Sequence, residues 1–579
     1  MKKRYKLSAP QVDLLFCIVL LTCVLMYGIG RIYGFIIYPD EFGYWASAAR
    51  VLGYDWSKIA SLGSYYSYGY SILLIPILFL FHNPVAAYRA AIVVNMFLLI
   101  GTFFLLLEIV SIIYPKKKLE LRIIFSGIAL FYPTWIFYMQ ITLAEIVLVF
   151  AFCLVSFTLL KYLDTGRMPW LVSLVSAIGF LYMIHMRTIA VMIAVCGTLL
   201  VRMIKRNRKG KQFLLFLLSL VLCLAFTVLL KRIVQTHIYS GSGAEQLAIN
   251  DYAGQWSKIA AIFTKEGMKA FLVSLVGKIY YLGMSTFGTF YLGCAFMLRR
   301  ILQSVREGKS WGKNFYFYLF LFLAVAGEIL INAIYCKEYG RIDSLVYGRY
   351  DEFILPIVML LGLHELFLIC RKVSKCVAGM TTILMFHLGT TWLLESVIET
   401  HHITNLHGGY FIPGLCYALK FVPFRPDTFF WWAFLADFIL MLLVWLVFFL
   451  CSRKPGWEQV LWAIVGVEVV LGIMLCEQFT YPYNRVSYGN AYLAEELEEK
   501  IAEGRRLVSY HNTEDDVFIS SLQFLLRDED IVLVSEAEKE QLQSSDLVVL
   551  YATEDDQGYL MTRYKKSKAY GSFWLYYNP

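Results

Sequence analysis

Long apolar runs alternate with short polar segments over most of the chain. The runs lie at about 12–34, 86–113, 122–139, 144–162, 170–185, 188–204, 212–231, 271–297, 314–334, 353–370, 376–395, 428–450 and 458–476. Many of them exceed the roughly 18 residues that suggest a membrane-crossing helix. The pattern therefore predicts an α-helical polytopic membrane protein with about 13 transmembrane helices.

The pattern changes after residue 476. In the tail, short apolar runs rich in Val, Ile and Leu alternate with polar pieces of helical character, as in RRLVSYH, DIVLVS and DLVVLY. Such alternation predicts strands and helices of a small α/β domain. The tail has no Gly-rich phosphate loop, so nothing in it indicates nucleotide binding. We predict two domains, a transmembrane domain over 1–476 and an extracytoplasmic domain over 477–579.

Charge sets the expected orientation. Of the 579 residues, 59% are hydrophobic and 16% are charged, and half of the 52 Lys and Arg residues flank the runs at 2–6, 116–122, 161–167, 202–211, 299–313, 371–375 and 453–454. Because basic loops stay in the cytoplasm, the N-terminus is expected inside and the tail outside. The net charge of +9 then requires no nucleic acid. We expect a multi-pass plasma membrane protein, and lysine-rich inner loops are compatible with a bacterial one.

The first outer loop, at about 35–85, carries an acidic pair among aromatic residues. Its motif YPDEFGYW contains Asp40 and Glu41, and the later SYYSYGYSIL contains Tyr65 and Tyr68. The simpler interpretation is an interfacial aromatic belt with two solvated acids. A partly desolvated carboxylate is also a sound general base, because burial raises its pKa toward the working range. Adjacent residues of a regular element point in different directions, so only one of the two acids is expected to be the base.

Further ionisable residues are expected at the same membrane face. Glu145 begins a helix in TLAEIV, Arg187 follows His185 in IHMRT, and Arg349 precedes Tyr350 in GRYDEFILP. The simpler interpretation is an acid that is favourable at a helix N-terminus and arginines that snorkel at the membrane edge. An acid this close to hydrocarbon nonetheless indicates function, and an arginine fork suits an anionic phosphate. Acids that activate a nucleophile beside cations that hold a phosphate suit a lipid-phosphate substrate in the bilayer.

Histidines of a later outer loop offer a weaker alternative. His401, His402 and His407 lie near Glu399, which hints at a metal or at a histidine base in a membrane-bound acyl- or phosphotransferase. Their spacing fits no standard zinc pattern. Most of the 12 cysteines stand inside apolar runs without a CxxC motif, so neither a zinc site nor a disulfide framework is indicated.

The order of the outer-loop motifs resembles that of the GT-C superfamily of polytopic glycosyltransferases. The matching stretches are YPDEFGYW, YSYGYSILLIPIL, TLAEIV and GRYDEFILP. The similarity is to the group that contains aminoarabinose transferases acting on lipid A and protein O-mannosyltransferases, which is glycosyltransferase family 39-like. It covers about residues 1–475 and leaves the tail unassigned.

The resemblance implies transfer of a sugar from a polyprenyl-phosphate donor to an acceptor hydroxyl at the extracytoplasmic face, with inversion at the anomeric carbon. It implies Asp40 as the general base. It further implies positioning of acceptor or donor by Glu41, Glu145, Tyr65 and Tyr68, and binding of the donor phosphate by Lys58, Arg187, Arg349 and Tyr350. The acceptor is a lipid, a polymer or a protein. Family members differ in their need for a divalent cation, and they more often carry other residues where Arg187 stands.

A transporter, such as a flippase for a lipid-linked oligosaccharide, is the main alternative. It predicts charged residues in mid-helix or helices broken near the midplane. Glu328 is one mid-helix acid, but most ionisable residues stand at the outer edge. The chain also shows no internal repeat, which argues against a transporter built from two similar halves.

Overall fold

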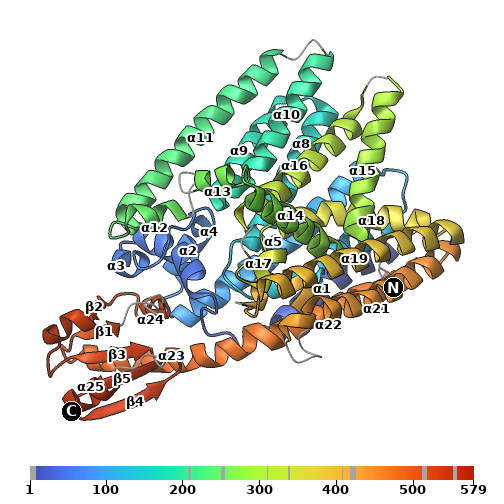
Figure 1. Ribbon diagram of the computed structural model, residues 1–579. Coiled ribbons are helices and arrows are strands. Elements are labelled where there is room, and N and C mark those ends of the chain that lie inside the picture. Colours follow the sequence, from blue (N-terminus) through green and yellow to red (C-terminus); the bar gives the residue numbers. More distant parts are fainter. Residues whose placement is uncertain are drawn as a thin grey trace, which may run out of the picture.

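The computed structural model describes residues 8–206, 210–249, 255–308, 311–336, 339–406, 408–416, 425–511, 518–551 and 557–579. Within them, ten helices are long and apolar enough to cross a membrane, or up to 12 if two bent pairs each count as one span. The chain is thus a multi-pass membrane protein with a largely helical fold (Figure 1).

Each of the predicted runs has a helical counterpart. The straight spans are α1 (Ala9–Ile29), α5 (Pro84–Ile113), α8 (Glu145–Thr165), α10 (Ile189–Arg206), α11 (Gly210–Ile238), α16 (Lys313–Tyr335), α18 (Leu355–Ile369), α19 (Val373–His401), α21 (Phe429–Arg453) and α22 (Trp462–Leu475). A shorter apolar helix, α9 (Met168–Ile184), matches the run at 170–185. The remaining two runs form the bent pairs.

The bends correct two predicted helices. The run at 122–139 is α6 (Leu119–Leu130) and α7 (Pro133–Met139), which meet at 60°. Pro133 starts α7, and proline cannot continue a helix because it lacks the N–H group. The run at 271–297 is α14 (Lys265–Met284) and α15 (Thr289–Arg306), which meet at 106°. Phe287 and Gly288 have positive φ angles of 53° and 82°, a conformation that ends a helix.

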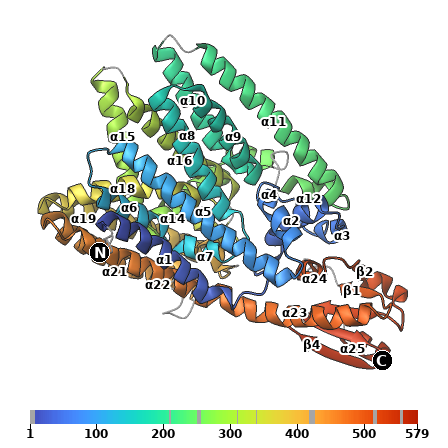
Figure 2. The ribbon, with the colours of Figure 1, turned by 180° about the vertical axis from the view of Figure 1, so that it is seen from behind.

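The first outer loop is mostly helical. It forms α2 (Tyr38–Val51), α3 (Ser57–Ala60) and α4 (Ser71–Leu80). The last of these is the short apolar stretch SILLIPILFLF, which is too short to span a bilayer. Figures 1 and 2 show these helices at one end of the bundle, beside the strands of the chain's C-terminal part. We call this end the C-domain end.

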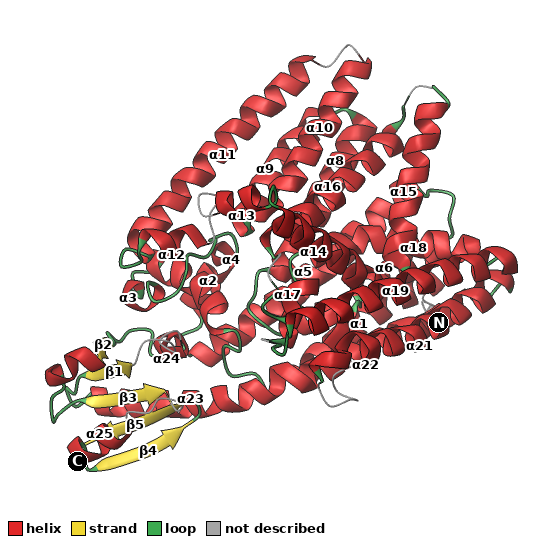
Figure 3. Cartoon of the chain, in the orientation of Figure 1, coloured by secondary structure: helices red, strands yellow, loops and turns green. Residues whose placement is uncertain are grey.

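The last membrane helix continues into the C-terminal domain. After α22, a π-helical turn (Cys476–Thr480) leads without a break into α23 (Tyr481–Ile501). The predicted domain boundary at 476/477 therefore falls inside one long helix. Beyond it lies a five-stranded sheet in the order β2-β1-β3-β5-β4 (Figure 3). Its strands are β1 (Leu507–His511), β2 (Val532–Ser535), β3 (Leu547–Tyr551), β4 (Lys566–Tyr570) and β5 (Phe573–Tyr577).

This sheet and its helices form the small α/β domain predicted from the tail. β1 pairs in parallel with β2 and β3, while β5 pairs antiparallel with β3 and β4. Two short helices, α24 (Ile519–Leu525) and α25 (Gln557–Arg563), connect the strands. Small helices of the other loops are α12 (Ala244–Ile249), α13 (Trp256–Ala261), α17 (Ile342–Val346) and α20 (Pro413–Cys416).

The C-terminal domain is anchored on the first outer loop. Arg527 donates hydrogen bonds from Nη1 to the carbonyls of Leu78 (3.4 Å) and Phe81 (3.1 Å), at the C-terminal end of α4. Trp56 donates from its indole nitrogen to the Arg527 carbonyl at 2.9 Å. The ring of Phe524 on α24 lies 5.0 Å from that of Trp45 on α2. The helices of the first loop are therefore held from both sides, by the bundle and by the sheet domain.

Candidate active site

A polar cavity of about 140 Å³ opens at the C-domain end. Four separate parts of the chain contribute to its wall, namely the first outer loop, the start of α8, the turn between α9 and α10, and the segment before α18. The lining residues are Asp40, Tyr44, Ser64, Tyr65, Tyr66, Ser67, Glu145, His185, Arg187, Arg349 and Tyr350.

Local structure explains how each charged side chain reaches the cavity. Asp40 stands in the first turn of α2, and Glu145 is the first residue of α8. Both positions favour a negative charge, because the N-terminal N–H groups of a helix carry a partial positive charge. Arg187 lies in a 3₁₀ turn between α9 and α10. Arg349 follows Gly348, where any Cβ atom would collide with the ring of Tyr281.

Arg349 joins the two acids. Its Nη1 lies 2.8 Å from Asp40 Oδ2, and its Nε lies 2.5 Å from Glu145 Oε1. Arg349 and Glu145 are buried, whereas 21% of the Asp40 side chain is exposed. Burial alone would lower the pKa of Arg349, but the charges of Glu145 and Asp40 raise it above its usual value. Tyr66 donates from its hydroxyl to Asp40 Oδ1 at 2.8 Å, so Asp40 is held from two sides with part of its carboxylate open.

Arg187 is the second buried cation of the cavity. Its Nε donates to His185 Nδ1 at 3.1 Å, and its guanidinium lies over the ring of Tyr350. Burial, with the charges of Arg187 and Arg349, holds the pKa of His185 well below its ordinary value. His185 is therefore neutral near pH 7 and accepts this hydrogen bond, leaving the positive charge of Arg187 uncompensated by His185.

Two polar atoms of the cavity wall lack a partner. Glu145 Oε2 and Arg187 Nη1 are both buried, and neither has a hydrogen bond to any residue that the structure describes. Buried polar atoms are nearly always paired, and an exception requires an explanation. An acceptor and a cationic donor at one cavity fit a ligand that carries both hydroxyl and anionic groups.

Solved structures identify this architecture. No protein-family model matches the chain, and no curated protein matches it. The fold is similar to the crystal structure of ArnT from Cupriavidus metallidurans in the apo state, with a TM-score of 0.55 and 14% identity over 98% of both chains. The same ArnT bound to undecaprenyl phosphate gives a TM-score of 0.56 and 13% identity over 97% of both chains. The chain has the GT-C fold.

This result confirms the resemblance predicted from the order of the outer-loop motifs. A weaker match, with a TM-score of 0.41, is arabinosyltransferase EmbB from Mycobacterium smegmatis, which covers 80% of this chain and 41% of that chain. At these identities the likeness establishes the fold alone. The roles of single residues in this chain therefore depend on its own geometry.

Six of the predicted site residues line the cavity described above. They are Asp40, Tyr65, Glu145, Arg187, Arg349 and Tyr350. The structure thus brings together residues that lie more than 300 positions apart in the sequence. Glu41, Tyr68 and Lys58 do not line this cavity, and each has another partner.

Glu41 faces away from Asp40 into the protein. Its carboxylate accepts hydrogen bonds from the backbone N–H groups of Ile36 (2.8 Å), Ile37 (2.9 Å) and Thr142 (3.1 Å), and from the hydroxyls of Thr142 (2.6 Å) and Tyr88 (2.5 Å). Burial raises the pKa of Glu41, and the bonds from Thr142 and Tyr88 counteract that rise. Glu41 therefore fastens the entry of α2 to the loop before α8 instead of reaching the cavity.

Lys58 and Tyr68 also point elsewhere. Lys58 forms an ion pair with Asp530 of the C-terminal domain at 2.7 Å, and both side chains are largely exposed. Tyr68 donates from its hydroxyl to the carbonyl of Thr227 on α11 at 2.6 Å. The structure places neither residue where it could contact a phosphate bound beside Arg187.

Tyr66 is one of the cavity residues that the sequence did not single out, with Tyr44, Ser64 and Ser67. It belongs to the same SYYSYGY cluster as Tyr65 and Tyr68, but its hydroxyl is the one that reaches Asp40. Residues 64–67 form no helix or strand, so no periodicity in the sequence orders these side chains. Tyr44 lies one turn of α2 beyond Asp40, and its i, i+4 spacing on a helix would have indicated it.

The histidine alternative receives no support from the described residues. His401, at the end of α19, stacks on the ring of Tyr339 with centroids 4.2 Å apart. His402 ends the same helix with a positive φ of 50°. His407 lies outside the described residues. Among the residues that the structure describes, no three His, Cys, Asp or Glu side chains are grouped so that they could hold a metal ion.

Proposed function

We propose that this protein is a membrane glycosyltransferase that transfers a sugar from a polyprenyl-phosphate donor to an acceptor hydroxyl, with inversion. The observation that carries the proposal is the convergence of Asp40, Glu145, Arg187 and Arg349 on one cavity. The shared fold adds weight, since ArnT has been solved with undecaprenyl phosphate bound. The proposed orientation has the N-terminus in the cytoplasm and the cavity at the extracytoplasmic face of a plasma membrane.

Asp40 is assigned as the general base. Its carboxylate is the more exposed of the two acids that Arg349 joins, so an acceptor hydroxyl can reach it. In the reaction Asp40 accepts the proton of that hydroxyl, and the hydroxyl oxygen forms a bond to the anomeric carbon. The bond from that carbon to the donor phosphate breaks on the opposite face, and the phosphate leaves with the electron pair.

Arg187 and Arg349 are assigned to the leaving phosphate. Negative charge grows on its oxygens as the bond breaks, and fixed cations in a dry cavity stabilise that charge strongly. Arg187 Nη1 has no partner among the described residues and is free to donate to a phosphate oxygen. Tyr350 supports it, because the Arg187 guanidinium lies over the Tyr350 ring.

Glu145 and Tyr65 are assigned to positioning. Glu145 Oε2 has no partner in the described part of the chain and can accept a hydrogen bond from a sugar hydroxyl. Tyr65 lines the same wall. A divalent cation does not fit between Asp40 and Glu145, because the Arg349 guanidinium occupies that place, and no step above uses one.

Asp40→Asn tests the proposal. The variant is reconstituted into liposomes with a radiolabelled polyprenyl-phosphate sugar and a panel of lipid, polymer and protein acceptors. Loss of a general base lowers the rate by about 10²–10⁴-fold. The matched control is Asp55→Asn, which removes an acid of the same loop whose side chain is 63% exposed and should transfer at the wild-type rate.

Two outcomes would overturn the assignment. Wild-type transfer by the Asp40→Asn variant would exclude Asp40 as the base. Movement of the lipid-linked sugar across the liposome membrane, with no transfer to any acceptor in the panel, would favour the transporter alternative.

A further inference from the structure

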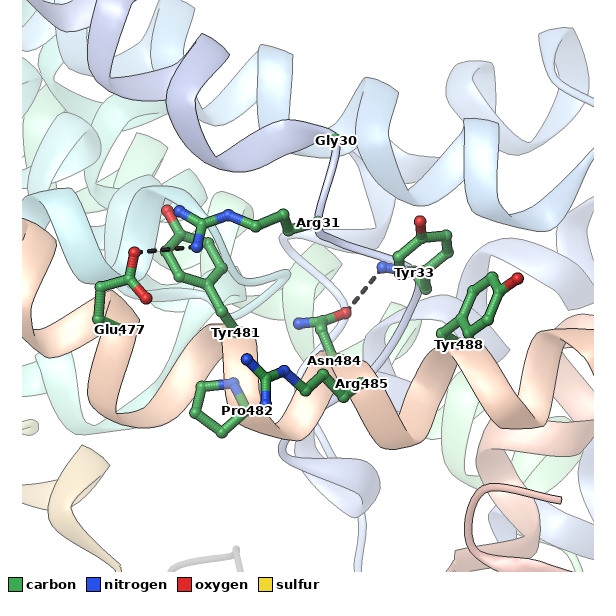
Figure 4. A pocket seen from close by; sticks show the side chains of 9 residues that line it. All are labelled: Gly30, Arg31, Tyr33, Glu477, Tyr481, Pro482, Asn484, Arg485 and Tyr488. Atoms are coloured by element: carbon green, nitrogen blue, oxygen red, sulfur yellow. Dashed lines mark hydrogen bonds and ion pairs between the residues drawn. The ribbon is translucent and has the colours of Figure 1, made fainter. Parts of the chain in front are cut away.

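A second cavity lies where the first and last membrane helices leave the bilayer. It has a volume of about 340 Å³ and lies between the turn after α1 and the beginning of α23 (Figure 4). Its lining residues are Gly30, Arg31, Tyr33, Glu477, Tyr481, Pro482, Asn484, Arg485 and Tyr488. None of them lines the cavity around Asp40.

The cavity lies at the ends of two apolar helices. The membrane helix α1 ends at Ile29 and α22 ends at Leu475, so the lining residues follow directly after both apolar spans. Tyrosines gather at this level, with the rings of Tyr33 and Tyr488 4.9 Å apart. Aromatic side chains are enriched at the membrane–water interface because they combine an apolar ring with a polar group.

The walls of the cavity are fixed by the protein. Asn484 Oδ1 accepts hydrogen bonds from the backbone N–H groups of Tyr33 at 2.7 Å and Gly34 at 3.2 Å, which joins the turn after α1 to α23. The π-helical turn at Cys476–Thr480 directly precedes this part of α23, and such turns are frequent at functional sites. A ligand therefore finds a preformed space between two helix ends.

The cavity carries an excess of positive charge. Arg31 Nη1 pairs with Glu477 at 2.9 Å, and its guanidinium lies 3.7 Å from the ring centroid of Tyr481. Arg31 Nη2 is covered but has no hydrogen bond to the described residues. Arg485 is exposed and forms no hydrogen bond or ion pair with any described residue, so its charge is uncompensated. Two arginines and one carboxylate leave one positive charge unbalanced, which an anion can neutralise.

An apolar surface continues below the cavity into the membrane. The α1 helix exposes Phe16 (42%), Val19 (49%) and Met26 (65%), and α22 exposes Val470 (57%). The two helices lie side by side, since the rings of Phe16 and Trp462 are 4.9 Å apart. A cationic cavity above an apolar helix pair has the polarity of an amphiphile with an anionic head and hydrocarbon chains.

We propose that this cavity binds the phosphate group of a phospholipid from the leaflet at the C-domain end, with the acyl chains along α1 and α22. Arg485 and Arg31 donate to the phosphate oxygens, as arginine forks do. The lipid would tie the end of α1 to α23 and so hold the helix that leads to the C-terminal domain. This binding is independent of the glycosyl transfer proposed above.

Arg485→Gln is the test variant, because its side chain is exposed and its replacement breaks no described contact. The delipidated protein is titrated in detergent with short-chain phosphatidylglycerol, and bound lipid is counted by native mass spectrometry. We expect one tightly bound phospholipid and a loss of affinity of about tenfold in the variant. Lys565→Gln, which removes an exposed charge elsewhere in the C-terminal domain, should bind like the wild type.

Further probes identify the source of the phosphate. Short-chain diacylglycerol, which lacks phosphate, and glycerol 3-phosphate or inorganic phosphate, which lack acyl chains, should each bind at least tenfold more weakly. Equal binding of diacylglycerol would refute the role of the arginines. Equal binding of inorganic phosphate would show a site for soluble anions and refute the lipid. Equal weakening by Lys565→Gln would reduce the effect to general surface charge and refute the cavity.

Discussion

Replacing Glu41 by Gln separates the roles of the two adjacent acids. Glu41 accepts five hydrogen bonds, three of them from backbone N–H groups that cannot turn away. A glutamine keeps one acceptor oxygen and turns its NH₂ group toward the remaining donors. In the better orientation the hydroxyls of Tyr88 and Thr142 rotate to accept, and the backbone N–H of Thr142 keeps only its long bond of 3.4 Å to the Tyr88 hydroxyl.

Loss of the stronger bond of a buried donor costs about 1–3 kcal/mol, and the remaining bonds weaken because the acceptor is no longer charged. We therefore expect Glu41→Gln to lower the free energy of unfolding by about 2–4 kcal/mol. Transfer activity per folded molecule should stay within about threefold of the wild type. Asp40→Asn should instead cause a large loss of transfer, with a smaller loss of stability than Arg349→Gln because Arg349 keeps its pair with Glu145.

The assay is unfolding in mixed micelles with increasing denaturing detergent, followed by transfer measured on the folded fraction. Glu503→Gln, a replacement at an exposed position of the C-terminal domain, controls for loss of a negative charge. Unchanged stability of Glu41→Gln would refute the reasoning, because it would mean that the buried carboxyl already carries a proton that the amide imitates.

Three further predictions concern charged groups near and away from the cavity. Arg349→Gln should lower the free energy of unfolding by about 3–5 kcal/mol because it leaves a buried carboxylate unpaired. Adding Glu145→Gln to this variant should restore at least half of the loss. Additive losses in this double-mutant cycle would contradict a stabilising interaction between Arg349 and Glu145. Burial raises the pKa of Asp351 to about 7, so the folded protein holds this proton more tightly than the unfolded chain, and its stability falls as pH rises. Between pH 5 and pH 8 the wild type should lose on the order of 2 kcal/mol more than Asp351→Asn. Parallel curves of stability against pH for the two proteins would contradict this prediction. Lys58→Gln should change the free energy of unfolding by less than about 1 kcal/mol, because its pair with Asp530 is exposed. The variant should transfer sugar at nearly the wild-type rate. A tenfold loss of transfer would instead indicate that Lys58 takes part in donor binding.

The apolar pattern predicted the membrane helices because each of them must bury or expose a continuous apolar surface in lipid. It did not predict the bend between α14 and α15, since the bend depends on the backbone conformation of Phe287 and Gly288. Hydropathy averages over such a pair of residues. The tail was predicted as a small α/β domain for the opposite reason, since short strands alternate with polar helices within it.

The sequence predicted part of the candidate site, because it predicted which loops lie on the same side of the membrane. Basic loops assigned Asp40, Glu145, Arg187 and Arg349 to one face, and the structure places all four around one cavity. The direction of each side chain was not predictable in the same way. Successive residues of a helix point about 100° apart, but only the packing of α2 shows that Asp40, and not Glu41, faces the cavity.

Local sequence patterns did not predict ion pairs and hydrogen bonds between residues far apart in the chain. Lys58 stands in the first outer loop, and its partner Asp530 is 472 residues further along the chain. Charge alone made Lys58 a candidate for phosphate binding. The same limit applies to Tyr66, whose contact with Asp40 depends on the irregular path of residues 64–67.

The contact of Arg527 with the end of α4 has a consequence for biosynthesis. α4 leaves the ribosome early, but the side chain that satisfies its last carbonyls is made 446 residues after Phe81. Carbonyls without hydrogen bonds at a helix end destabilise that end, so the first outer loop completes its native contacts only when the final segment has been made. A chain that stops before α24 would insert its membrane helices and leave the wall beside Asp40 unfinished.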